Sequence, residues 1–181
     1  MFKMILFPLM LSAIIVSNCN GQYSEMNTES AKKNEALIQK NNSLAIGGPN
    51  RKLAVEFLNG LLNARDIAYI STKAAPNISF RTSFGSVLTG MSADGGLAKL
   101  PGALDNIFLG FTIELEDMIV EANKVYLKVV FRGIHSSAYL ATQASNKPFK
   151  VDGFVRLIVA DNKIAQGFVV ADFAQIPNRI K

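Results

Sequence analysis

The chain has 181 residues, with 19 Lys and Arg against 14 Asp and Glu, one His and one Cys. This length suits one domain with a hydrophobic core plus accessory segments. The basic residues are scattered, whereas nucleic-acid binding needs a concentrated basic face, so no nucleic-acid partner is expected. One histidine and one cysteine exclude a histidine-cluster or thiolate metal site and an intrachain disulfide. No cofactor and no metal are expected.

The N-terminus is typical of a secretory signal peptide. Lys3 is followed by an apolar run over residues 4–16, which is too short to span a bilayer as a helix, since that takes about 20 residues. The alternative is a buried N-terminal helix. We expect residues 1–18 to be a removable signal peptide and the mature protein to work outside the cytoplasm.

A cysteine lies directly after this apolar run. The segment Val16-Ser17-Asn18-Cys19 resembles the lipobox of bacterial lipoproteins, whose cysteine is lipidated and becomes the new N-terminus. Asn18 differs from the small residue usual before that cysteine, so ordinary signal-peptidase cleavage stays an alternative. Lipidation of Cys19 implies a membrane-anchored lipoprotein, periplasmic or at the cell surface. The alternative implies a soluble exported protein.

Residues 19–49 are predicted to form a flexible tether. They are rich in Asn, Ser, Gln, Lys and Glu, with no aromatic residue after Tyr23. Such a composition buries too little apolar surface to offset the entropy lost on ordering. A short helix around residues 29–39 is the alternative. Gly47-Gly48-Pro49 marks the expected boundary of the folded domain, residues 50–181.

Three helices are expected in the first part of this domain. Apolar residues recur at helical spacing over residues 53–62. Asp66 can cap a second helix over residues 67–73. A third is expected within residues 97–107, where an internal proline kinks it or delays its start. Alternation around residues 78–80 indicates a short strand between the second and third helices.

The second half of the domain predicts four consecutive strands. Apolar and polar residues alternate over residues 111–116, 125–135, 149–159 and 164–173, as in strands with one buried face. Asp161-Asn162 is typical of a tight hairpin turn. Strands joined by short turns pair most simply into an antiparallel sheet. The predicted fold class is α+β, a curved antiparallel sheet covered by three N-terminal helices.

Several segments carry a family resemblance. They are Leu62-Asn63-Ala64-Arg65-Asp66, Arg132-Gly133-Ile134-His135, and the stretch from Val159 to Ile164 followed by Asp172-Phe173. In order and spacing, residues 51–175 resemble the SnoaL-like branch (ester cyclases and polyketide cyclases) of the nuclear-transport-factor-two-like superfamily. The resemblance implies a cone-shaped α+β barrel whose wide end opens a pocket.

The resemblance also indicates where the cyclases of this branch perform acid–base chemistry. Their catalytic aspartate aligns with Val169, and their nearby histidines align with Val155 and Gly167. Among the residues compared with the cyclases in this way, only His135 is the same type of amino acid as in the family. Because a valine can neither accept nor donate a proton, we expect no polyketide cyclisation here and favour a protein that is not an enzyme.

Side-chain alternation along the strands predicts an apolar pocket. Such a pocket suits a small apolar molecule held by few polar groups. Asp172 is three residues after Val169 and should therefore face the opposite side of the sheet. A dyad with His135 would require a bulge. Tyrosine hydroxyls are expected at the mouth, although packing is the commoner role of aromatics near a sheet. The expected lining and mouth residues are Tyr69, Phe131, His135, Tyr139, Val155, Gly167, Val169 and Ala171.

Two functions remain open. The first is an exported module that binds a small apolar molecule without chemistry. The second is an isomerase, cyclase or hydrolase that uses His135 as general acid/base, because the unperturbed pKa of histidine is near 6.5. His135 can instead be a strand-end residue bonded to backbone, and Asp172, the second catalytic candidate, can instead satisfy backbone donors.

One face of the predicted sheet mixes charged and apolar side chains. As in relatives of this branch, it is a candidate homodimer interface. Its apolar members are Tyr126, Val130, Phe154 and Ile158.

Overall fold

The computed structural model describes residues 31–140 and 142–176. The expected signal peptide, Cys19 and the first part of the expected tether lie outside these residues. Among the residues that are described, no helix is long and apolar enough to cross a membrane.

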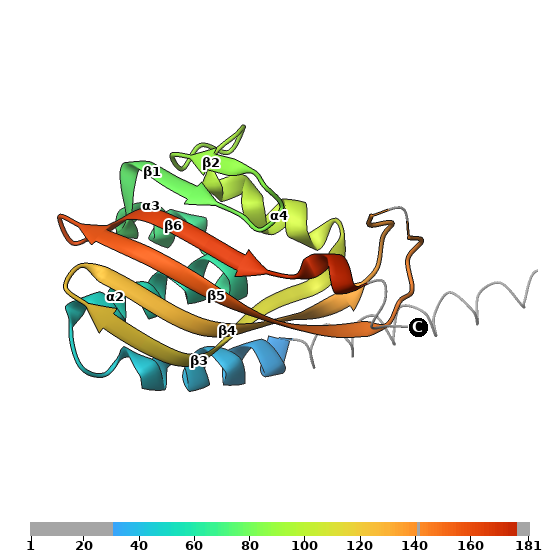
Figure 1. The fold of residues 1–181 in the computed structure, drawn as a ribbon, viewed down its shortest axis with the longest axis horizontal. Coiled ribbons are helices and arrows are strands. Elements are labelled where there is room, and N and C mark those ends of the chain that lie inside the picture. The colour runs from blue at the N-terminus through green and yellow to red at the C-terminus, as the bar shows by residue number, and fades with distance from the viewer. Residues whose placement is uncertain (1–30, 141, 177–181) are drawn as a thin grey trace, which may run out of the picture.

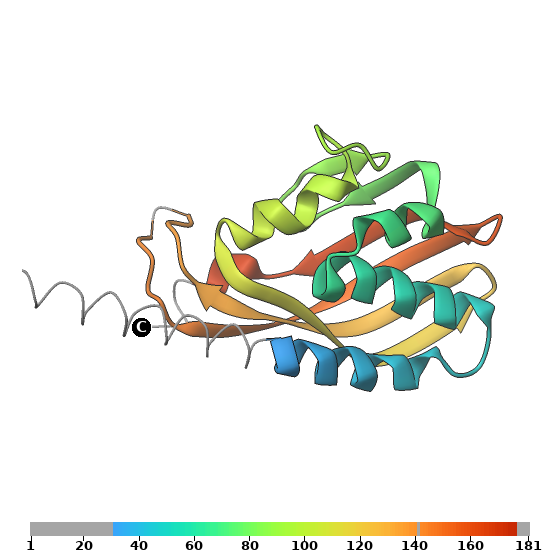
Figure 2. The same cartoon turned by 180° about the vertical axis from the view of Figure 1, so that it is seen from behind.

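A curved six-stranded sheet forms one layer and the helices lie on one of its faces (Figures 1 and 2). The strand order is β2-β1-β6-β5-β4-β3, with β2 and β3 at the edges, so the sheet is not closed. Strands β3 to β6 pair antiparallel in sequence order, whereas β1 pairs parallel with β6. The predicted α+β fold is confirmed. The strands are β1 Ala74–Arg81, β2 Val87–Thr89, β3 Phe108–Glu121, β4 Lys124–His135, β5 Pro148–Ala160 and β6 Lys163–Ala171.

The turn between β5 and β6 has the predicted geometry. Asp161 and Asn162 have φ angles of 51° and 55°, and two successive residues with positive φ are what a two-residue hairpin requires. Asn and Asp tolerate this left-handed conformation better than most residues. The local sequence therefore sets the pairing of the last two strands.

The predicted helices are present with adjusted bounds. Helix α2, Pro49–Leu58, continues into a π-helical turn, η2, Asn59–Ala64. The Asp66 carboxylate caps α3, Ile67–Lys73, by accepting a hydrogen bond from the Tyr69 amide at 2.9 Å. The third predicted helix starts as a 3-10 turn, η3, Leu97–Lys99, before α4, Leu100–Asp105, whose first turn contains the proline.

The prediction of a flexible tether is wrong for residues 31–45. Residues 31–42 are helical and run along β3, and a 3-10 turn, η1, Ser43–Ala45, follows (Figure 2). Asn41 is fully buried. The polar composition of this segment does not keep it disordered, because polar side chains of the helix bond to the sheet instead of to water. Ordered structure therefore begins well before residue 50.

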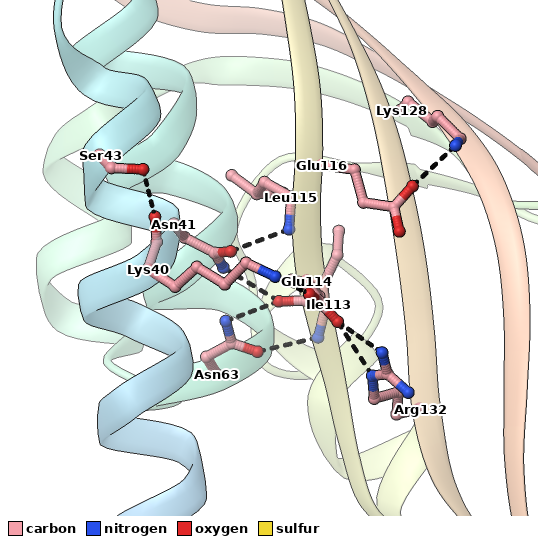
Figure 3. Close-up of polar contacts among 10 residues, drawn as sticks. All are labelled: Lys40, Asn41, Ser43, Asn63, Ile113, Glu114, Leu115, Glu116, Lys128 and Arg132. Carbon is pink, nitrogen blue, oxygen red and sulfur yellow. Dashed lines mark hydrogen bonds and ion pairs between the residues drawn. The ribbon is translucent and has the colours of Figure 1, made fainter.

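Asparagine side chains cover the free edge of β3 (Figure 3). Asn63 accepts from the Ile113 amide and donates to its carbonyl, both at 2.9 Å. Asn41 donates to the same carbonyl at 3.0 Å and accepts from the Leu115 amide at 2.8 Å. Both also donate to the Asn59 side-chain oxygen. These amides satisfy buried backbone groups that a neighbouring strand would otherwise pair.

Two arginines continue this cover at both ends of the asparagine set. Arg65 donates to the Phe111 carbonyl at 2.7 Å, and Arg51 donates to the Met118 carbonyl at 2.6 Å. Edge strands with open backbone groups are sites of unwanted strand pairing. The helices therefore close this edge with side chains.

A buried carboxylate lies close to the same edge (Figure 3). Glu114 contacts the Lys40 ammonium and accepts from Arg132 Nη2 at 2.6 Å. The hydrogen bond from Lys40, followed by that from Arg132, lowers the pKa of Glu114. A lowered folded-state pKa stabilises the fold above the unfolded-state value, and this stability is lost as pH falls through the folded-state pKa.

We expect Glu114→Gln to lower the unfolding free energy at pH 7 by about 1–2 kcal/mol, since both partners are partly exposed and water screens them. Its stability should also fall less steeply than that of the parent as pH drops below about 4.5. Urea unfolding between pH 7 and pH 3 measures both effects. Glu121→Gln, an exposed carboxylate at the end of β3, is the control, with a change within about 0.5 kcal/mol. An equal acid response in both variants would contradict the assignment.

Candidate ligand-binding site

A cluster of aromatic rings fills one end of the space between sheet and helices. Neighbouring ring centroids lie 4.9 Å apart for Phe108 and Phe149 and 5.2 Å apart for Phe131 and Phe173. Such edge-to-face and tilted pairs are favourable packing geometries. The cluster holds six of the chain's 12 phenylalanines. Its members are Phe84, Phe108, Phe111, Phe131, Phe149 and Phe173, with His135 and Tyr139 at its border.

A small cavity, partly open to the surface, lies beside this cluster. Its volume is about 30 Å³, enough for about one water molecule. The only polar side chains in its wall are two hydroxyls, which donate to backbone carbonyls: Thr82 to Ser86 at 3.3 Å and Ser83 to Val169 at 3.1 Å. None of its lining residues is ionisable. They are Leu58, Leu62, Phe80, Thr82, Ser83, Phe84, Leu100, Leu104, Phe111, Phe131, Val155, Val169 and Phe173.

A larger groove of about 220 Å³ lies next to the cavity. It runs between the α4 region and the turn that joins β1 to β2. Phe84, at this turn, lines both spaces, is 39% exposed and stacks on Phe173 at 4.9 Å. Its ring is therefore a shared wall of groove and cavity. The groove is lined by Thr82, Phe84, Ser86, Leu88, Lys99, Leu100, Ala103, Leu104 and Ile107.

The structure brings together only part of the predicted pocket. Phe131, Val155 and Val169 line the cavity. Gly167 does not, because the Phe80 ring covers it: a Cβ atom at Gly167 would lie 2.1 Å from Phe80 Cδ2. Gly167 does lie on the predicted face of β6, but the neighbouring Phe80 ring fills the space in front of it.

Three other predicted residues lie around or away from the cavity. Ala171 is half-buried against the core and does not line it. Tyr69 is 39% exposed on α3, where the Lys73 ammonium lies 4.8 Å from its ring centroid, so it is not at the mouth. Tyr139 packs edge-on against Phe108 at 5.2 Å. Burial raises the pKa of Tyr139, and the negative charge of Asp172 adds to this.

His135 is fully buried at the end of β4 and does not line the cavity. Its Nδ1 lies 3.3 Å from the Ser145 hydroxyl, and its Nε2 has no hydrogen-bond partner among the described residues. Asp172 instead accepts from the Gln175 side chain in the following turn. The described part of the chain shows no His135–Asp172 dyad and no group of three potential metal ligands.

Sequence reasoning missed Phe84 and the hydroxyls beside it. They lie in a Gly/Ser-rich loop, where alternation gives no face to follow. The composition of this loop could have pointed to Phe84, because a phenylalanine in a polar loop is either exposed or packed against another element. Here it packs on Phe173.

The model of the SnoaL-like polyketide cyclase family matches residues 52–178. The chain belongs to this family. Its SnoaL-like domain is similar to the SnoaL-like protein of Shewanella putrefaciens CN-32, at 11% identity and a TM-score of 0.64, covering 74% of this chain and 97% of that one. It is also similar to TsrD from Streptomyces laurentii, at 20% identity and a TM-score of 0.60, covering 73% and 94%. A comparison with curated proteins gives no match. Such identities establish the shared fold alone.

Proposed function

We propose that this SnoaL-like domain binds a small apolar molecule at the aromatic end of its sheet, without the proton-transfer chemistry of the family's cyclases. The observation that carries the proposal is the cavity wall, which contains no ionisable side chain. Val169, which aligns with the cyclases' catalytic aspartate, is part of that wall. Acid–base catalysis requires a titratable group within hydrogen-bond reach of the substrate.

Binding requires the groove and the cavity to join. A volume of about 30 Å³ is far below the roughly 300 Å³ of common ligand pockets. Phe84 separates the two spaces and is the most exposed ring of the cluster's phenylalanines. Rotation of this side chain away from Phe173 opens the cavity to a ligand in the groove.

Filling the cavity should weaken binding. We expect Val169→Phe to reduce the affinity for an apolar fluorescent probe such as Nile red at least tenfold, because the new ring occupies the space behind Phe84. Fluorescence titration of the purified protein measures this. The matched control is Val170→Phe, since Val170 is the next residue, faces the opposite side of the sheet and is 51% exposed. Thermal unfolding of both variants separates lost binding from lost folding. Absence of saturable binding by the parent protein would contradict the proposal.

The alternative function is an isomerase-type or hydrolase-type enzyme that uses His135. One observation favours it, the buried Nε2 without a partner in the described residues, since a substrate group could supply the missing hydrogen bond. Against it, the ring borders Phe108 and Tyr139, and its side-chain hydrogen-bond partner among the described residues is the Ser145 hydroxyl and not a carboxylate. The enzyme would be supported if His135→Gln abolished turnover of an ester or ketone but left probe binding unchanged.

We also propose that the protein is exported and that Cys19 is lipidated, on the strength of the lipobox resemblance. Mass spectrometry of the mature N-terminus distinguishes a lipidated cysteine from ordinary signal cleavage.

We further propose that the outer face of the sheet pairs two copies. Phe154 and Val170 are cross-strand neighbours on this face and are 63% and 51% exposed. Tyr126 is exposed as well, whereas Val130 is buried within the monomer, so the apolar patch is narrower than expected. Light scattering that shows a monomer at micromolar concentration would contradict this assembly.

A further inference from the structure

The groove beside Phe84 is lined by uncharged residues and a single lysine. Eight of its nine lining residues are apolar or carry only a hydroxyl, and the ninth is Lys99. Lys99 is exposed and has no ion pair with any described residue. The acid of α4, Asp105, is paired with Arg65 at 2.8 Å. The groove therefore combines a long apolar floor with one unneutralised positive charge.

This combination selects for an amphiphile rather than a purely apolar molecule. A lysine can lay its aliphatic stem along apolar surface while its ammonium stays in water. An anionic group that meets the ammonium at that boundary keeps part of its hydration, so the pairing avoids the cost of burying a charge. A neutral apolar ligand would gain nothing from Lys99.

We propose that the ligand is an aliphatic carboxylate, an inference that rests on the proposed function. Its chain lies in the groove between the α4 region and the β1–β2 turn and reaches past Phe84 into the cavity, and its carboxylate pairs with Lys99. The groove and the cavity follow one another along this path because Thr82, Phe84, Leu100 and Leu104 line both.

Calorimetric titration with decanoate and with decanol tests the charge. We expect decanoate to bind the purified protein about fivefold more tightly, as an exposed ion pair permits. Lys99→Met should remove this preference and leave the affinity for decanol unchanged. Lys124→Met, an exposed lysine at the start of β4, should leave both affinities unchanged.

A chain-length series tests the path. From hexanoate to decanoate, affinity should rise about fourfold for each methylene that enters apolar surroundings. Phe84→Ala should raise the affinity for dodecanoate more than that for hexanoate, because only the longer chain extends past the ring into the cavity. Equal gains for both acids would contradict the path.

The outcomes separate this inference from the proposed function. If decanol binds as tightly as decanoate and Lys99→Met changes neither, the carboxylate assignment is overturned while apolar binding stands. If decanoate, decanol and Nile red all fail to bind, both proposals are overturned.

Discussion

Replacing Asn63 by alanine is expected to lower the unfolding free energy of the domain by about 3–4 kcal/mol. Asn63 is buried, and its side chain provides the acceptor for the Ile113 amide and one of the two side-chain donors to the Ile113 carbonyl. Alanine leaves that amide buried without a partner, at a cost of about 1–3 kcal/mol, and the lost amide bonds add about 1 kcal/mol each. The carbonyl keeps its bond from Asn41, which limits the loss.

Urea unfolding at neutral pH measures this effect. Asn50→Ala is the matched control, because Asn50 also donates to a backbone carbonyl, that of Ala122, but at an exposed position. Water replaces that bond, so the control should lose less than about 1 kcal/mol. Similar losses in the two variants would show that the asparagine cover of β3 does not stabilise the edge.

Much of the fold could be predicted because its signals are local. The period of two over β3 to β6 and the Asp161-Asn162 turn specify the antiparallel part of the sheet through neighbouring residues alone. The parallel pairing of β1 with β6 joins segments about 90 residues apart, and no local pattern encodes it. A short helix around residues 29–39 was only the alternative to a flexible tether. The helix at residues 31–42 uses its polar side chains as hydrogen-bond partners of β3, which composition does not reveal.

In the candidate site, too, local patterns could be predicted and packing between distant segments could not. The alternation of side chains along the strands put Phe131, Val155 and Val169 on one face of the sheet, and all three line the cavity. It could not show how the enclosed space is filled, since Phe84 reaches it from a loop. Tyr69 was misplaced because its position depends on how α3 packs, which the helical pattern leaves open.

Gly167→Ala is the second large effect expected, and it tests why the predicted pocket is smaller than parity suggested. A Cβ atom at this position would lie 2.1 Å and 2.2 Å from two edge carbons of the Phe80 ring. That ring is 1% exposed and borders only the cavity of about 30 Å³. It therefore has little space to move into, and the overpacking should cost about 2–3 kcal/mol. This outweighs the roughly 0.4–1 kcal/mol that alanine gains over glycine by restricting the unfolded chain.

Gly95→Ala isolates the clash at Gly167, because a Cβ atom at Gly95 has no heavy atom within 4 Å. Thermal and urea unfolding should show this variant unchanged or slightly stabilised, while Gly167→Ala is destabilised. Replacing the ring by a smaller side chain should reduce this cost. In a Phe80→Leu background, Gly167→Ala should cost less than about 1 kcal/mol, since leucine leaves room for the methyl group. An equal cost in both backgrounds would mean that the backbone of β6, rather than Phe80, excludes a side chain at this position. The cavity would then be small because of how closely the strands approach, and not because phenylalanine rings fill it.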